Sequence, residues 1–316
     1  MAQDKIINSL RREEKDRLHA MNDCNHHLSK FARNLNLEYL KGNLTPIYNR
    51  EEILITAQKI LLRKGKANIL LVGSAGCGKT AIAEGLASLL VEQQIAYNKA
   101  VAEAEAEKEA EGLERRRNVE KPLFLDCVIY DLSMNALLGG TQYRGMFEER
   151  LEKIVNIASE DRRIILFIDE IHQINTIGSD KEGATSMGQV LKPALARGQM
   201  RVIGATTTEE SEIIKKDKAL ARRFSEVFVS QLVGASAVQC LESIMNDYSK
   251  FHKVGFNKTV TALEVYAKTC EALPRSVFPN NVIDIVDEVL ASAKFEGKKS
   301  VDITDIEKVI RRMIRR

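Results

Sequence analysis

The segment GSAGCGKT, residues 73–80, has the glycine spacing and the closing Lys-Thr pair of a loop that wraps phosphate oxygens. Glycines let consecutive backbone N–H groups curl around an anion, and the positive end of the following helix adds to the attraction. Lys79 is expected to reach the β- and γ-phosphates of a nucleotide, and the Thr80 hydroxyl is expected to ligate Mg²⁺. The expected nucleotide-binding residues of this segment are Gly73, Ser74, Ala75, Gly76, Cys77, Gly78, Lys79, Thr80 and Ala81.

A second pattern with chemical meaning is the apolar run IILFIDEIH, residues 164–172, which ends in two carboxylates. Asp169 is expected near the metal as a second ligand. Glu170 is expected near the attacking water, which it orients and polarises as a general base. His172 has no companion ligands in the sequence, so we interpret it as a structural histidine.

Two further groups of polar residues belong with these motifs. VIGATTT, residues 202–208, is a third apolar run that ends in hydroxyls, and we expect Thr207 rather than Thr206 to contact the γ-phosphate and water. The alternative is an ordinary threonine at a strand end. Arg222 and Arg223 stand at a helix end, where an arginine pair is often only solvated. Beside the other motifs, we expect them to enter the site of a neighbouring subunit and stabilise transition-state charge.

These side chains need a sheet to position them, and the chain from Ala67 to Val229 supplies one. Short apolar runs alternate there with helical patterns, and each run is continuous, as expected for parallel strands covered on both faces. This alternation predicts a doubly wound α/β domain. The expected strands are 67–72, 127–132, 164–168, 201–205 and 226–229.

The rest of the chain divides around this domain. Residues 1–40 are expected to be an N-terminal helical segment, packed on its own domain rather than docking a partner. The large α/β domain covers 41–233, and its Ala- and Glu-rich stretch 94–121 is predicted to be a solvated helical excursion. Residues 234–316 carry helical patterns only and are expected to form a small all-helical domain.

Composition limits the kind of protein. The 316 residues are 44% hydrophobic and 29% charged, an ordinary globular balance, and the formal net charge of +3 is too small to indicate nucleic acid or an anionic membrane. Five cysteines without a CxxC pair indicate reduced thiols. The N-terminus has no signal-peptide core, and no apolar run approaches the roughly 20 residues that span a bilayer, so a cytoplasmic protein is expected.

Taken in order along the chain, the motifs resemble those of the first AAA+ module of the Clp/Hsp100 unfoldases, over about residues 35 to 295. The resemblance implies an AAA+ P-loop NTPase fold with a parallel-sheet large domain and a small all-helical lid domain. It also implies ATP and Mg²⁺ as cofactors and a ring, usually a homohexamer, with ATP bound between subunits. The six motifs are NLTPIYNREEI, GSAGCGKTAIAEGLA, GGTQYRGMFEERL, IILFIDEIH, LKPALARGQMRVIGATT and ALARRFSEVFV.

The same resemblance assigns residues that spacing alone does not. Ile47 matches the position whose backbone lies beside the adenine, and residues 178–188 look like a second pore loop. Tyr143 matches the aromatic of the central pore loop, and an aromatic there can grip an extended polypeptide with little regard to its sequence. The expected pore-loop residues are Gln142, Tyr143, Arg144 and Gly145.

The sequence also departs from the family. Gln142 stands where the first module usually has a basic residue, so a weaker grip or different substrates are expected. No arginine precedes Pro279, so a sensor-2 arginine is not expected, as in that first module. No middle domain, second module or substrate-recruiting N-domain is recognisable, which led us to expect a stand-alone single-ring protein.

The expected function is therefore an ATPase that remodels, unfolds or threads proteins, with polypeptides and other copies of itself as partners. Whether an adaptor or peptidase joins it stays open, and a membrane is not expected. The alternative is a nucleic-acid-associated AAA+ ATPase, favoured by the basic segments LERRRN and VIRRMIRR but opposed by the small net charge. A third reading, a nucleotide-switched adaptor that hardly turns over, is opposed by the complete catalytic set.

Overall fold

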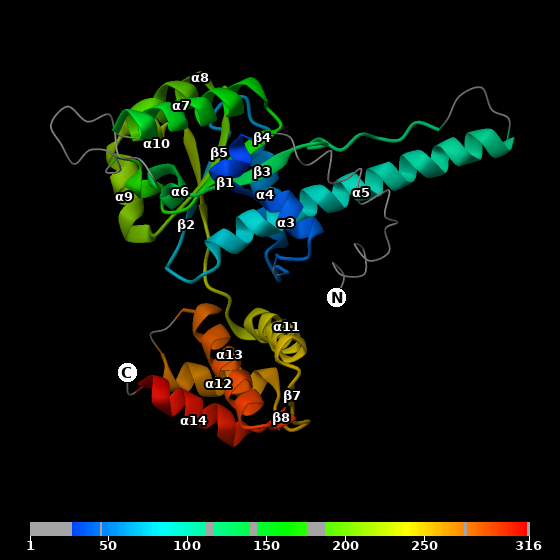
Figure 1. Cartoon of the computed structure of the whole chain (residues 1–316), viewed down its shortest axis with the longest axis vertical. Coiled ribbons are helices and arrows are strands. Elements are labelled where there is room, and N and C mark those ends of the chain that lie inside the picture. Colours follow the sequence, from blue (N-terminus) through cyan, green and yellow to red (C-terminus); the bar gives the residue numbers. More distant parts are fainter. Residues whose placement is uncertain are drawn as a thin grey trace. The chain divides into compact units, whose positions relative to one another are not determined.

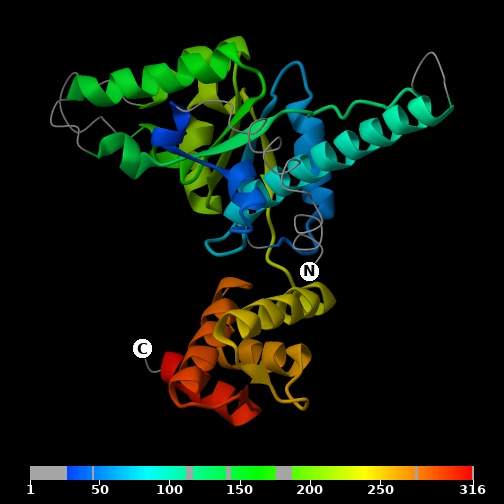
Figure 2. The ribbon, with the colours of Figure 1, turned by 45° about the vertical axis from the view of Figure 1, so that its right-hand side comes forward.

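The computed structural model describes residues 27–44, 46–111, 117–139, 144–175, 187–274 and 277–314 (Figures 1 and 2). It divides into two compact units. The first, which we call the α/β unit, comprises Met1–Ile47, Glu52–Val72 and Thr80–Val227. The second, the helical unit, comprises Tyr48–Glu51, Gly73–Lys79 and Phe228–Arg316. The expected boundary at 233 thus lies close to the observed division, but the phosphate loop groups with the helical unit.

A six-stranded sheet in the order β1-β3-β4-β5-β2-β6 organises the α/β unit. Strands β3, β4, β5 and β2 run parallel to one another in that order. All residues of β2 and β4 are buried, which explains their continuous apolar sequences. The strands are β1 (Ala32–Asn34), β2 (Asn68–Val72), β3 (Val128–Leu132), β4 (Ile164–Ile168), β5 (Arg201–Thr206) and β6 (Phe224–Phe228).

Strand β1 differs from the helical segment that was expected over residues 1–40. Residues 27–40 hold η1 (Leu28–Lys30), β1 and α3 (Leu35–Leu40), and β1 pairs antiparallel with β3. The side chains of Leu28 and Ala32 are buried in the core of the α/β unit. A short edge strand and its flanking turn therefore bury these apolar residues, and no long helix is needed. Residues 1–26 lie outside the described residues.

The helices of this unit follow the strands in the predicted alternation. Helix α5 (Lys79–Glu111) is one continuous helix of 33 residues that joins the helix expected at 81–93 to the first part of the 94–121 excursion. Its second half is mostly exposed and extends away from the sheet (Figure 1). The other helical elements are α4 (Glu51–Leu61), α6 (Met134–Leu138), α7 (Arg144–Glu160), η2 (Ile171–Asn175), α8 (Met187–Arg197), α9 (Thr208–Lys216) and α10 (Lys218–Ala221).

The helical unit packs four helices around its own apolar core, and it also contains a small sheet that the sequence did not predict. Strand β7 (Gly255–Phe256) pairs parallel with β8 (Ser300–Val301). Buried Val301 joins the same core as the helices. The helices are α11 (Gly234–His252), α12 (Ala262–Ala272), α13 (Asn280–Phe295) and α14 (Ile303–Ile314). In the described part of the chain, no helix has the length and apolar character needed to cross a bilayer.

Candidate nucleotide site

The loop 73–78 joins the carboxyl end of β2 to the first residue of α5, as the sequence predicted. Its glycines are required by space and by backbone conformation. A Cβ on Gly73 would lie 2.3 Å from the carbonyl oxygen of Val229, and Gly76 and Gly78 have φ angles of +77° and +94°. A backbone without side chains at these points can bring its amides close to an anion.

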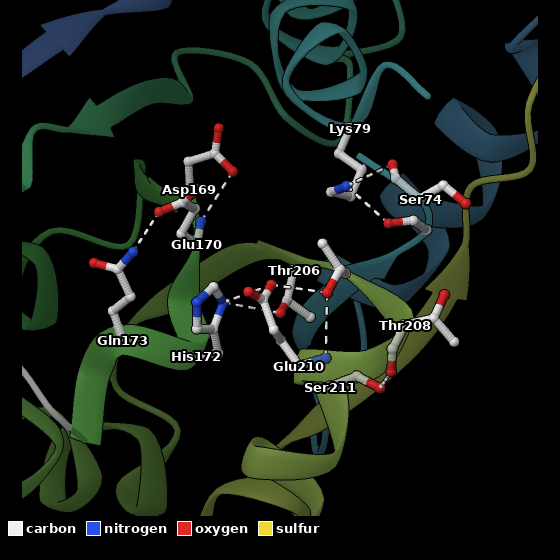
Figure 3. Close-up of polar contacts among 12 residues, drawn as sticks. Ser74, Lys79, Asp169, Glu170, His172, Gln173, Thr206, Thr208, Glu210 and Ser211 are labelled. Atoms are coloured by element: carbon white, nitrogen blue, oxygen red, sulfur yellow. Dashed lines mark hydrogen bonds and ion pairs between the residues drawn. The ribbon is translucent and has the colours of Figure 1, made fainter. Parts of the chain in front are cut away.

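Lys79 stands at the end of this loop and folds back onto it. Its Nζ donates hydrogen bonds to the carbonyl oxygens of Gly73 at 2.8 Å and Ser74 at 2.9 Å (Figure 3). The ammonium group is thus held over the loop that is expected to receive phosphate, where its positive charge complements an anion.

Arg50, a residue that was not singled out from the sequence, contacts the loop at Cys77. Arg50, 7% exposed, donates from Nη2 to the carbonyl oxygen of Cys77 at 3.0 Å. Burial raises the pKa of the Cys77 thiol, so this side chain packs as a neutral group. Arg50 belongs to the motif NLTPIYNREEI, in which the sequence analysis assigned a role only to Ile47.

In the α/β unit, Thr80 and Asp169 are joined directly. The Thr80 hydroxyl donates to Oδ2 of Asp169 at 2.9 Å, although the residues are 89 positions apart. Asp169 follows β4, whose buried side chains fix where the strand ends. A hydroxyl and a carboxylate oxygen side by side are ligands that suit Mg²⁺, so this pair fits the metal predicted from the sequence.

Glu170 is held on both its backbone and its side chain. Its backbone has a φ of +49°, and its N–H donates to Oδ1 of Asp169 at 2.9 Å. Its carboxylate accepts a short hydrogen bond from Nε2 of Gln173 (Figure 3). Gln173 was not predicted, because a glutamine within a one-turn helix carries no sequence signal of its own.

A second carboxyl group lies in the field of Asp169. Asp131, on β3, is in register with Arg33 of β1 and Phe167 of β4. Burial, and then the charge of Asp169, raise the pKa of Asp131 to about 6, although Arg33 opposes the shift. Arg33 also pairs with Glu84 at 3.2 Å. The environment of Asp169 therefore contains a carboxyl group with a pKa of about 6, and sequence reasoning missed it.

The two threonines after β5 differ in their contacts. Thr207 caps α9: its hydroxyl accepts from the Glu210 N–H at 3.2 Å and donates to Oε2 of Glu210 at 2.8 Å. Thr206 is buried, and its hydroxyl lies 3.1 Å from Nδ1 of His172, which also lies 3.3 Å from Oε2 of Glu210. His172 thus connects η2 to α9 (Figure 3). Thr207 remains the proposed contact to the γ-phosphate.

The arginine pair lies between α10 and the start of β6, beside the first residue of β2. Arg222 is exposed at the end of α10, and Arg223 is half-buried with its carbonyl accepting from Nδ2 of Asn68 at 3.2 Å. Asn68 is the first residue of β2, whereas the phosphate loop follows its last residue. Five strand residues span about 16 Å. This distance supports the expectation that the arginines act on another subunit.

The remaining predicted residues are placed only in part. Ile47 packs against α5, where a Cβ on Gly85 would lie 2.6 Å from its side chain. Gln142 and Tyr143 lie outside the described residues, and Arg144 and Gly145 begin α7. Of the second candidate pore loop, only its last two residues are described, at the start of α8.

Comparisons with known proteins show which family the chain is similar to. The model of the ATPase family associated with various cellular activities (AAA) matches residues 69–232. The chaperone protein ClpB of Aquifex aeolicus is 36% identical over 271 residues, which are 85% of this chain and 24% of that protein. ClpB of Mycoplasma pneumoniae is 36% identical over 274 residues, covering 85% of this chain and 34% of its own length.

Solved structures give the same result for the fold. The closed state of Hsp104 with ATPγS and FITC casein matches with a TM-score of 0.74 and 30% identity, over 92% of this chain and 45% of that chain. The Saccharomyces cerevisiae Hsp104–ADP complex matches with a TM-score of 0.72 and 30% identity, over 90% and 45%. The chain thus spans less than half the length of these relatives.

Proposed function

Because this chain belongs to the AAA family of ATPases and has a Clp/Hsp100-like module, we propose that it is a cytoplasmic, Mg-ATP-dependent ring ATPase that remodels, unfolds or threads proteins through a central pore. The observation that carries the proposal is the hydrogen bond between Thr80 and Asp169, which joins the residue after the phosphate loop to the acidic end of β4. Together they provide two of the oxygens that a nucleotide-bound Mg²⁺ requires.

The chain's own residues divide the work of hydrolysis. ATP would supply the phosphoanhydride bond that is broken, and Mg²⁺ would neutralise the negative charge that develops on the phosphate oxygens. The glycine loop and Lys79 bind the phosphates, and Thr80 and Asp169 hold the metal. Glu170 accepts a proton from water, in an orientation maintained by Gln173. Thr207 positions the γ-phosphate and the water.

The proposed ring supplies the groups that one chain lacks. Arg222 and Arg223 would complete the site of the next subunit, because a strand length separates them from their own phosphate loop. Polypeptide as the substrate is supported by the matched Hsp104 structures, one of which contains casein. In this proposal Tyr143 contacts the polypeptide in the pore, beside Gln142.

Replacing Tyr143 separates the mechanical step from the chemical one. Tyr143→Ala should leave ATP hydrolysis within about twofold of the unaltered protein, because the residue lies outside the phosphate motifs, yet abolish unfolding of a fluorescent model protein. Tyr143→Phe keeps the aromatic ring and serves as the matched control. Unfolding that survives Tyr143→Ala at the unaltered rate would disprove the pore-loop assignment while leaving the ATPase assignment intact.

The same assay tests the rival class. Unfolded protein should stimulate ATP hydrolysis, and DNA should not. Stimulation by DNA alone would instead identify a nucleic-acid-associated ATPase.

A further inference from the structure

The α/β unit has a pocket at the amino ends of its parallel strands. It is formed where β2 and β5 begin, and buried Asn68 and Met200 are among its lining residues. Seven basic side chains line it, and no Asp or Glu among the described residues does so. They are Arg63, Lys64, Lys66, Arg162, Arg197, Arg201 and Arg223.

These basic residues come from separate parts of the sequence. The first three lie in the segment between α4 and β2, and Arg197 ends α8. Basic side chains near the carboxyl ends of helices are ordinary partners of the helix dipole. Arg162 and Arg223 likewise follow closely on the ends of α7 and α10, whereas Arg201 begins β5. Helix ends therefore favour basic residues at most of these positions, but they do not explain why the seven side chains line one pocket.

The positive charge of the pocket is not compensated within the described structure. None of the seven side chains lies within 4.0 Å of a described carboxylate oxygen in an ion pair, whereas adjacent Arg163 pairs with Asp161 at 2.6 Å. A cluster of like charges around one concave site repels itself and attracts an anion. An anion with several negative charges would relieve this repulsion best.

The base of the pocket is rigid. The side chain of Asn68, 3% exposed, donates to the carbonyl oxygen of Arg223 at 3.2 Å and accepts from the N–H of Val202 at 2.9 Å. It thereby fixes the starts of three neighbouring strands. Arg201 is held with its guanidinium 5.7 Å from the ring centroid of Phe124. Side chains fixed in this way lose little entropy on binding.

We propose that this pocket binds a phosphoanion with two or more phosphate groups. Guanidinium groups match phosphate oxygens in paired hydrogen bonds, and five of the seven basic residues are arginines. The phosphate can come from two sources: a free inorganic polyphosphate, or the phosphate tail of a nucleotide held by a second copy of this chain. In the second case Arg162 and Arg197 would also contact the nucleotide of the neighbouring subunit, in addition to Arg222 and Arg223.

The test measures, by isothermal titration calorimetry, the affinity of dilute protein for inorganic tripolyphosphate. The full chain carries Lys79→Ala, which weakens anion binding at the phosphate loop. Arg162→Glu combined with Arg197→Glu should weaken the remaining binding at least tenfold, because two exposed positive charges of the pocket are reversed. The control is Lys59→Glu, at an exposed position of α4 outside the pocket. It changes the net charge by half as much as the double variant does, and it should alter the affinity for tripolyphosphate less than twofold.

Equal affinities for the double variant and the Lys59 variant, or no saturable binding in the Lys79→Ala protein, would overturn the proposal. Melting temperatures of all variants show whether they remain folded. This result is independent of ATP hydrolysis, so it can fail without affecting the proposed function.

A second arm identifies the source of the phosphate. If the ligand is the nucleotide of a second copy, the double variant should lower ATP hydrolysis only at concentrations where subunits assemble, and tripolyphosphate should inhibit the unaltered protein there. If the ligand is a free polyphosphate, ATP hydrolysis by the double variant should equal that of the unaltered protein at all concentrations. Either result supports a phosphoanion site, provided that the double variant weakens tripolyphosphate binding in the first test.

Discussion

The hydroxyl of Thr80 donates a hydrogen bond to Oδ2 of Asp169 at 2.9 Å. This contact joins the first turn of α5, the helix that follows β2, to the end of β4, and β5 lies between β2 and β4 in the sheet. Both oxygens are therefore placed to coordinate one cation, because α5 and β4, which carry them, are held by a buried sheet.

The contact predicts how Thr80 variants behave. Thr80→Val keeps the shape of the side chain but removes the hydroxyl, so the Mg²⁺ concentration that half-activates ATP hydrolysis should rise roughly 10- to 100-fold. Thr80→Ser retains the hydroxyl and should stay near the unaltered value. A metal titration of ATP hydrolysis measures both, and a Val variant with unaltered metal dependence would count against this ligand.

Gln173 predicts a separate effect on the chemical step. Its hydrogen bond to the Glu170 carboxylate orients the general base, so Gln173→Leu should lower kcat about tenfold and leave KM within twofold. Gln199→Leu changes an exposed glutamine elsewhere and serves as the control. Steady-state ATP hydrolysis separates the outcomes, since a change confined to KM would show that Gln173 affects binding rather than the base.

Action of the arginines between subunits predicts rescue on mixing. Arg223→Ala removes a group that serves the neighbouring site, whereas Glu170→Gln removes the base of the chain's own site. Each variant alone should hydrolyse ATP poorly, but mixed rings contain some sites with an intact Glu170 and an intact arginine.

ATP hydrolysis by an equimolar mixture should therefore exceed the sum of the two separate activities. A mixture no more active than its components would mean that the arginines act within their own chain. The unaltered protein should also lose specific activity on dilution below its assembly concentration.

Asp131 predicts a pH dependence of stability. Its pKa is about 6 in the folded protein, above the ordinary value of 3.8, so the folded state holds this proton more tightly than the unfolded state. Deprotonation thus opposes folding, and the free energy of unfolding should fall as pH rises from about 4 through about 6. Asp131→Asn should remove this loss, with a gain on the order of 1 kcal/mol at pH 7, reduced because the side chain is only partly buried.

Urea unfolding at pH 5 and pH 7, without nucleotide or Mg²⁺, measures the effect. The matched control is Asp284→Asn, which changes an exposed aspartate of the helical unit. Equal pH dependence in the Asp131 variant and the unaltered protein would contradict the assignment.

The sequence predicted the features that depend on local spacing. The phosphate loop, the acidic end of β4 and the alternation of strands and helices were all recognisable, because glycine spacing and continuous apolar runs follow from local backbone needs. Strand β1 was missed because a strand of three residues, with alanine as its one apolar residue, is too short to show the apolar pattern that predicts a strand. Its pairing is decided by the edge of β3, far along the chain.

The site contacts that were missed depend on tertiary neighbours. Gln173, Arg50 and Asp131 each act through a partner supplied by the fold, and a glutamine, an arginine or an aspartate carries no sign of that partner in sequence. The basic pocket shows the same limit. Its seven residues are spread from Arg63 to Arg223, and the sequence assigned only the last of them to a function.

Helix α5 begins at Lys79, next to the phosphate loop, and ends 33 residues later at Glu111. At 1.5 Å per residue it is about 50 Å long, and most residues of its far half are exposed. A rigid rod of that length acts as a lever. A tilt of about 10° at its first turn would displace its far end by roughly 9 Å, so a small rotation beside the phosphate loop would become a large displacement at the far end of the helix.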